Sequence, residues 1–185
     1  LLENDRRAIE RVFQEKGEST PGLYRYDVGA GTLSARLFGF SGAQSNGTGD
    51  LFTYDGADLF FVDGANVFSL PHGLVTPAAV ASSTVGNITS IKLTDTRVLL
   101  EAGTPGNTSI YSVNKNGSGF VELFHTGNVG EQASLRSVEP GGWVFYTVSG
   151  PSGLNANRVR DTGASPASIG NAYWAGATFP ANLVD

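Results

Sequence analysis

Cysteine and methionine are both absent from this chain of 185 residues, and histidine occurs only twice. Without cysteine, the chain holds no disulfide, thiolate zinc site, iron–sulfur cluster or cysteine nucleophile. Two histidines leave little imidazole for metal ligation or acid–base catalysis. Charged residues make up only 16% of the chain, and Lys+Arg 12 against Asp+Glu 17 gives a net charge of −5. That balance argues against nucleic acid or an anionic membrane surface as the main partner, since both need clustered positive charge.

Long apolar runs are also missing: no stretch of 18 or more apolar residues occurs, so we expect no membrane-spanning helix. Low charge, absent cysteine and abundant Gly, Ser, Thr and Asn favour an exported protein (periplasmic, cell-surface, extracellular or virion) over a cytosolic enzyme. The chain starts at Leu1 and lacks methionine, which favours a removed leader or a part of a longer chain. Four Asn-x-Ser/Thr sequons, which are candidate glycan acceptors but also arise by chance, lie at Asn46, Asn87, Asn107 and Asn116.

Glycine, in contrast, is abundant at 25 of 185 residues, about twice its usual share. The hydrophobic fraction of 40% is sufficient for a folded core.

Residues 1–17 have no proline, and Leu2, Ile9 and Val12 share one helical face, so they predict a short N-terminal α-helix. We expect a linker over 18–22 and a β-repeat domain over 23–185.

From Leu23 onward, short β-branched or aromatic runs alternate with turn signals such as Asp55-Gly56 and Asn116-Gly117, which predicts strands and no second helix. The clearest predicted strands are Leu51–Tyr54, Leu59–Val62, Val67–Leu70, Ile91–Leu93, Val98–Glu101, Ile110–Val113, Phe120–Phe124 and Trp143–Val148. Similar strand-and-turn segments start near residues 23, 67, 110 and 156, a spacing of about 44 residues. Each unit therefore contains four short strands, which is the content of a β-propeller blade.

Ile110–Leu123 carries the most specific pattern of the repeat. It resembles the blade signature of TolB-like propellers, in which a strand runs through an Asn/Asp-x-Asn/Asp-Gly-Ser-Gly turn into a final hydrophobic strand. The resemblance covers one blade, while the other units match loosely, and it implies a binding and scaffolding fold. The repeat domain has room for about 3.7 blades, whereas propellers usually close with more.

An incomplete set of blades predicts a segment of a larger ring or one piece of an assembly. A compact four-bladed ring is one alternative, and a β-sandwich or jelly roll with accidental periodicity is another.

Candidate catalytic groups are scarce. His72 and His125 fall in predicted surface loops, and no Gly-x-Ser-x-Gly nucleophile elbow accompanies them. Asp55, Asp58 and Asp63 cluster at Gly-containing turns, which favours hairpin-turn aspartates over glycosidase carboxylates or a calcium loop. We therefore predict no catalytic residue, no metal ligand and no cofactor.

Aromatic residues supply the remaining candidates. Trp143 lies in an apolar strand and is predicted to belong to the core. Tyr173 and Trp174 lie among Gly and Ala near the C-terminus, where they suit stacking on a sugar or anchoring a partner, with local packing as the alternative. Together with Asp55 and Asp58, they form the candidate set of ligand or partner contacts.

The sequence thus predicts a non-enzymatic protein-binding or scaffolding module of an exported assembly, with other protein subunits as partners. One alternative is a carbohydrate-binding or carbohydrate-active protein, for which Asp55, Asp58 and the Tyr173-Trp174 pair are the candidates. Another is a structural subunit of a filament or virion, because an incomplete ring would expose strand edges and sheet faces.

Overall fold

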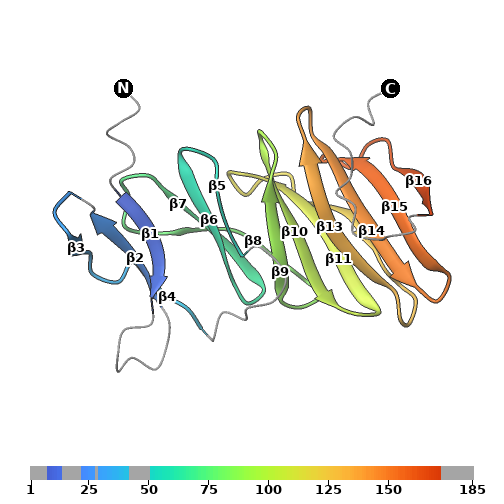
Figure 1. Ribbon diagram of the computed structural model, residues 1–185, viewed down its shortest axis with the longest axis horizontal. Coiled ribbons are helices and arrows are strands. Elements are labelled where there is room, and N and C mark those ends of the chain that lie inside the picture. Colours follow the sequence, from blue (N-terminus) through green and yellow to red (C-terminus); the bar gives the residue numbers. More distant parts are fainter. Residues whose placement is uncertain (1–7, 14–21, 28, 42–50, 172–185) are drawn as a thin grey trace.

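The computed structural model describes residues 8–13, 22–27, 29–41 and 51–171. These residues form sixteen strands in four four-stranded antiparallel sheets that follow one another along the chain. They contain no helix, and hence none that is long and apolar enough to cross a membrane. The sheets lie in a row with the first and fourth at opposite ends (Figure 1). The predicted all-β class and the predicted four-stranded units are confirmed.

The first sheet holds β1 (Ala8–Phe13), β2 (Gly22–Asp27), β3 (Thr32–Leu33) and β4 (Phe38–Gly39), with β3 and β4 both paired to β2. The second sheet holds β5 (Phe52–Tyr54), β6 (Asp58–Asp63), β7 (Asn66–Pro71) and β8 (Ala78–Ser82). The third holds β9 (Ile88–Leu93), β10 (Arg97–Thr104), β11 (Asn107–Asn114) and β12 (Val121–His125). The fourth holds β13 (Gln132–Glu139), β14 (Trp143–Gly150), β15 (Gly153–Arg160) and β16 (Ala167–Asn171).

The predicted N-terminal helix is wrong where the structure describes it. Ala8–Phe13 is strand β1, which pairs with β2 from Ala8 opposite Asp27 to Phe13 opposite Gly22. This pairing adds the fourth strand to the first sheet, so a tertiary contact overrides the local helical pattern. The other residues of 1–17 lie outside the described residues. The predicted linker over 18–22 is described only at Gly22, which already belongs to β2.

The sheets pack face to face, and the central strand of each inner sheet serves two interfaces. Successive side chains of a strand point to opposite faces. On β6, Phe61 packs toward the first sheet, whereas Phe60 and Val62 pack toward the third. On β10, Leu100 packs toward the second sheet and Leu99 toward the fourth. The core is therefore divided into three apolar layers between four sheets.

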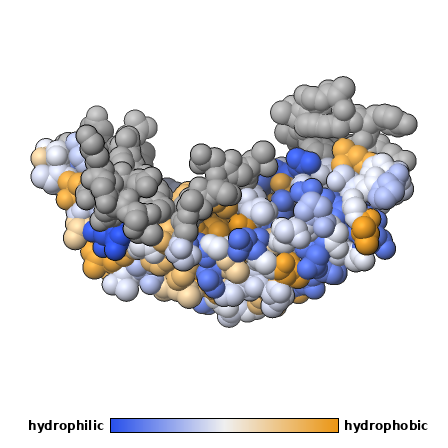
Figure 2. Space-filling model, turned by 90° about the horizontal axis from the view of Figure 1, so that it is seen from below, coloured by the Kyte–Doolittle hydropathy of each residue, from blue (hydrophilic) through white to orange (hydrophobic). Residues whose placement is uncertain are grey.

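The row of sheets is bent, with the strands β5, β9 and β13 on its inner side. β9 contacts β5 of the preceding sheet and β13 of the following one. Figure 2 shows the resulting crescent outline. The described residues thus form an open arc, and the alternatives of a closed four-bladed ring and a two-sheet sandwich are wrong for this part of the chain.

Candidate binding site

A hollow of about 700 Å³ opens where the inner strands of the second, third and fourth sheets converge. The lining residues come from four places in the fold: β5 and its end, β9 and the turn after it, β13, and the turn after β11. In that order they are Phe52, Thr53, Tyr54 and Asp55; Ile91, Lys92, Leu93, Thr94 and Asp95; Arg136, Ser137 and Val138; and Lys115. The hollow therefore depends on the packing of three separate sheets.

Asp55 and Lys115 connect two of those sheets at the rim of the hollow. The Lys115 Nζ donates to the Asp55 Oδ2 at 2.8 Å, and the two side chains are 23% and 16% exposed. The Asp55 Oδ1 accepts the main-chain N–H groups of Ala57 at 2.9 Å and Asp58 at 2.8 Å. This Asx turn agrees with the predicted hairpin-turn aspartate.

The protonation of Asp55 follows from these contacts. Partial burial raises the pKa of Asp55, but the hydrogen bonds from Lys115, Asp58 and Ala57 and the charge of Lys115 outweigh it and hold the pKa below the ordinary 3.8. Both carboxylate oxygens therefore accept hydrogen bonds within the chain.

Positive side chains are concentrated in the hollow. The chain has three lysines, and two of them, Lys92 and Lys115, line it together with Arg136. The lining carboxylates are Asp55 and Asp95. The Arg136 Nε donates to the Thr147 Oγ1 at 2.9 Å, which anchors the guanidinium group to the neighbouring strand β14. The hollow is therefore polar and of mixed charge, with a slight excess of cations.

Glu101 links the third and fourth sheets near this hollow. Glu101 lies on β10 and is 9% exposed. The Oε2 accepts the main-chain N–H of Leu135 on β13 at 2.7 Å, and the Oε1 accepts the Thr89 hydroxyl at 3.2 Å. Burial raises the pKa of Glu101 above the ordinary 4.5, although these two hydrogen bonds and the charges of Arg136 and Lys92 act in the opposite direction.

Of the two predicted contact residues that the structure describes, one lies at this site. Asp55 lines the hollow, whereas Asp58 is outside the lining and contributes its main-chain N–H to the Asp55 turn. Tyr173 and Trp174 lie outside the described residues. The role of all four as ligand or partner contacts stays a prediction. The sequence did not identify Lys92 and Arg136 as candidate contact residues, because only the folded arc brings β9 and β13 together.

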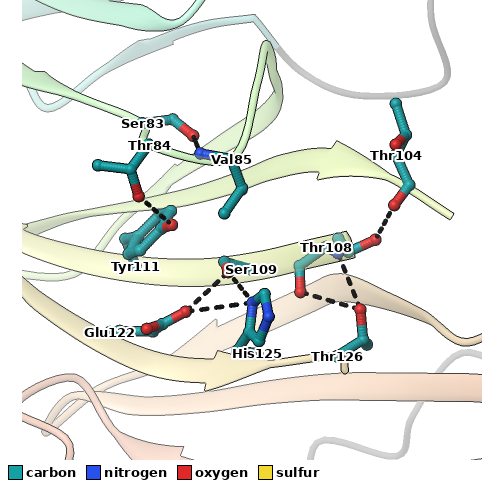
Figure 3. Close-up of polar contacts among 10 residues, drawn as sticks. All are labelled: Ser83, Thr84, Val85, Thr104, Thr108, Ser109, Tyr111, Glu122, His125 and Thr126. Carbon is teal, nitrogen blue, oxygen red and sulfur yellow. Dashed lines mark hydrogen bonds and ion pairs between the residues drawn. The ribbon is translucent and has the colours of Figure 1, made fainter. Parts of the chain in front are cut away.

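A second polar cluster joins β11 and β12 (Figure 3). The Ser109 Oγ lies 2.7 Å from the His125 Nδ1 and 2.7 Å from the Glu122 Oε1, and those two atoms are 3.5 Å apart. The register shifts where Ile110 faces Phe124 but Tyr111 faces Glu122. This bulge turns Glu122 and His125 toward the same side of the sheet.

The cluster combines serine, histidine and a carboxylate, but its serine is not placed as a nucleophile. Ser109 is 0% exposed, so a substrate cannot reach its hydroxyl. His125 is the last residue of β12, so its predicted assignment to a loop is wrong, but its side chain is 42% exposed and its predicted surface position is confirmed. His72 lies in the turn after β7, as predicted. Among the described residues, no group of three or more His, Asp or Glu side chains is arranged to hold a metal ion.

Comparison with known proteins establishes the fold. No family model matches the chain, and no curated protein matches it either. The chain is similar to the crystal structure of TolB from Acinetobacter baumannii, with a TM-score of 0.56, 15% identity, and coverage of 90% of this chain and 41% of that chain.

A structure from an analysis of two prolyl endopeptidases is similar as well, with a TM-score of 0.63, 11% identity, and coverage of 89% of this chain and 25% of that chain. The chain spans less than half the length of either structure. The propeller-type fold expected from the repeat is confirmed, and the resemblance to TolB-like propellers is confirmed at the level of fold.

Proposed function

We propose that this chain is a non-enzymatic protein-binding module, and that an extended segment of its partner lies in the hollow. The observation that carries the proposal is the convergence of β5, β9 and β13 around that hollow. Within the described residues, each of these strands is the end strand of its sheet and pairs with a neighbour on one side only. Unpaired strand edges present backbone N–H and C=O groups that an extended peptide can use.

The side chains around the hollow suit such a peptide. Tyr54 lines the hollow and is 56% exposed, so its ring adds an aromatic surface to the wall that a partner would meet. Lys92, Lys115 and Arg136 offer donors to carbonyl or carboxylate oxygens. A carbohydrate site is less well supported, because Asp55 already accepts hydrogen bonds at both oxygens.

An exported assembly is the setting we propose for this binding. The absence of cysteine, the low charge content and the abundance of glycine support it. The similarity to solved structures concerns the fold, so partner and location are both part of this proposal.

Peptide selection on the immobilised chain tests the hollow. Peptides selected from a random library should bind at least tenfold more weakly to Tyr54→Ala and to Lys92→Glu, because each change removes a lining contact. Leu74→Ala is a matched control, since Leu74 is 54% exposed but lies in the loop after β7. The affinity of this control, measured by fluorescence anisotropy, should equal that of the wild type. Equal binding by all variants, or no selected peptide at all, would contradict the proposal.

A further inference from the structure

The fourth sheet has one face that no other described sheet covers. Val144, Tyr146 and Val159 point toward the third sheet. By alternation, the opposite face carries Trp143 on β14 and Arg158 and Arg160 on β15. The register agrees, since Trp143 lies opposite Arg160. The predicted core position of Trp143 is wrong, because this residue lies on the outward face and is only partly buried.

Two guanidinium groups lie against one indole on this face. The Cζ atoms of Arg160 and Arg158 are 3.9 and 4.8 Å from the centre of the Trp143 ring. The Arg160 Nη1 also donates to the carbonyl of Gly141. All three side chains are partly exposed. The indole thus holds both cations in place while leaving them within reach of a partner.

This cluster carries positive charge that no ion pair balances in the part of the chain that the structure describes. Among the described residues, neither Arg158 nor Arg160 forms an ion pair with a carboxylate. Glu139 is opposite Trp143 on β13, and no ion pair joins it to either arginine in this part of the chain. In a chain of net charge −5, two adjacent guanidinium groups that have no carboxylate partner within the described ranges are a marked local exception. They present a forked set of donors suited to carboxylates.

We propose that this outward face, defined by Trp143, Arg158 and Arg160, docks an acidic segment of a partner protein. Carboxylates of that segment pair with the two guanidinium groups, and an apolar part of it lies on the indole. Tryptophan and arginine are the side chains most enriched at the energetic centres of protein interfaces. A nucleic acid fits less well, because its charge density requires a broader basic surface than two arginines in an acidic chain.

This site goes beyond the hollow, because none of its three residues lines the hollow. Its failure and the failure of the proposed function can therefore be observed separately. The hollow is tested with Tyr54 and Lys92, and the outward face is tested with Arg158 and Arg160.

The experiment uses the full chain carrying Trp174→Phe, so that Trp143 is the only indole. The probe is a blocked peptide of eight glutamates, titrated against Trp143 fluorescence and checked by calorimetry. We expect binding that weakens as salt is added. Arg158→Gln/Arg160→Gln should weaken it at least tenfold, and Arg158→Lys/Arg160→Lys should weaken it less. Arg36→Gln, which changes an exposed arginine between β3 and β4, is the matched control and should leave it unchanged. Circular dichroism and thermal melting confirm that each variant is folded.

Three results would overturn the proposal. The first is equal affinity of the glutamate peptide for the wild type and the double glutamine variant. The second is tighter binding of an eight-nucleotide single-stranded DNA than of the peptide, which would assign the face to nucleic acid. The third is concentration-dependent self-association, seen by light scattering and lost in the double glutamine variant, which would make the occupant a second copy of this chain.

Discussion

The interface between the first and second sheets differs in kind from the interface between the third and fourth. The former is a cluster of five phenylalanines whose ring centres are 4.8–6.4 Å apart, namely Phe38, Phe40, Phe52, Phe61 and Phe68. In the described part of this interface, a partly buried polar link joins Ser41 to Asp63. The latter is mainly aliphatic and is crossed by buried hydrogen bonds.

Those hydrogen bonds give the interface between the third and fourth sheets a more defined geometry than the aromatic interface has. The Glu101 Oε2 accepts the Leu135 N–H, and the Thr94 hydroxyl donates to the Asp161 Oδ2 at 2.8 Å. A buried polar group without a partner is costly, so these links fix the relative position of the sheets. Aromatic packing contributes area but tolerates several ring arrangements. The interface with the more restrictive contacts is the one beside the hollow.

The largest effect should come from the aromatic interface. Phe61 is 0% exposed and contacts four other phenylalanine rings. Phe61→Ala should therefore lower the free energy of unfolding by about 3–5 kcal/mol, measured by urea denaturation. Phe61→Leu should lose less, because it retains most of the buried volume. A loss from Phe61→Ala no greater than that from the exposed Tyr54→Ala would show that this cluster is not a core.

An intermediate effect is expected at the link between the third and fourth sheets. Glu101→Ala leaves the Leu135 N–H without its acceptor and should cost about 1–3 kcal/mol. Glu101→Gln keeps an acceptor oxygen and removes the buried charge, so its stability at pH 7 should equal or exceed that of the wild type. Urea denaturation of both variants tests this, and equal losses would refute the role of the hydrogen bond.

The contribution of Glu101 to the stability of the folded chain should depend on pH in a defined direction. Burial raises the folded-state pKa of Glu101 above 4.5, so the folded chain binds this proton more tightly than the unfolded chain does. The stabilising contribution is full below about pH 4.5 and is lost as the pH rises through the raised value. Thermal melting of Glu101→Gln between pH 4 and 8 should lack this component. An identical pH profile for both proteins would contradict it.

The smallest effect should come from the Lys115–Asp55 pair between the second and third sheets. Lys115→Gln should cost about 0.2–1 kcal/mol. Asp55→Asn should cost a similar amount, because asparagine retains the Oδ1 that accepts the N–H groups of Ala57 and Asp58. A double-mutant cycle measured by urea denaturation isolates the pair, and its coupling energy should fall in high salt.

Acid should also remove the contribution of this pair. The folded-state pKa of Asp55 is below 3.8, so its contribution is present above that pH and is lost as the pH falls through the lowered value. The direction is opposite to that of Glu101. Finding the same direction for both carboxylates would refute the assigned causes.

The clearest predicted strands match eight of the twelve strands in the last three sheets, because those eight have a local apolar signal, whereas β8, β13, β15 and β16 are not among them. The predicted Val98–Glu101 and Ile110–Val113 lie within β10 and β11, and their apolar runs suit strands buried on both faces. Strand β1 could not be found in this way, since the charged stretch around Arg11 also fits an amphipathic helix. Its state depends on pairing with β2, which is a tertiary contact.

The candidate site was less accessible to prediction for the same reason. Asp55 was found because its turn has a local signature, whereas its pairing with Lys115 spans 60 positions in the sequence. The outward position of Trp143 depends on which face of the fourth sheet meets the third, and the residue type alone does not reveal that.

The open row of sheets also determines how the molecule comes apart. Because each inner sheet is stabilised by two neighbours and each terminal sheet by one among the described residues, stability adds up along a line, as in a repeat protein. The first sheet, in which β3 and β4 are two residues each, should exchange its amide hydrogens fastest. The third sheet should exchange them slowest. Unfolding then proceeds inward from the ends, sheet by sheet, and the strands flanking β9 are the last to separate.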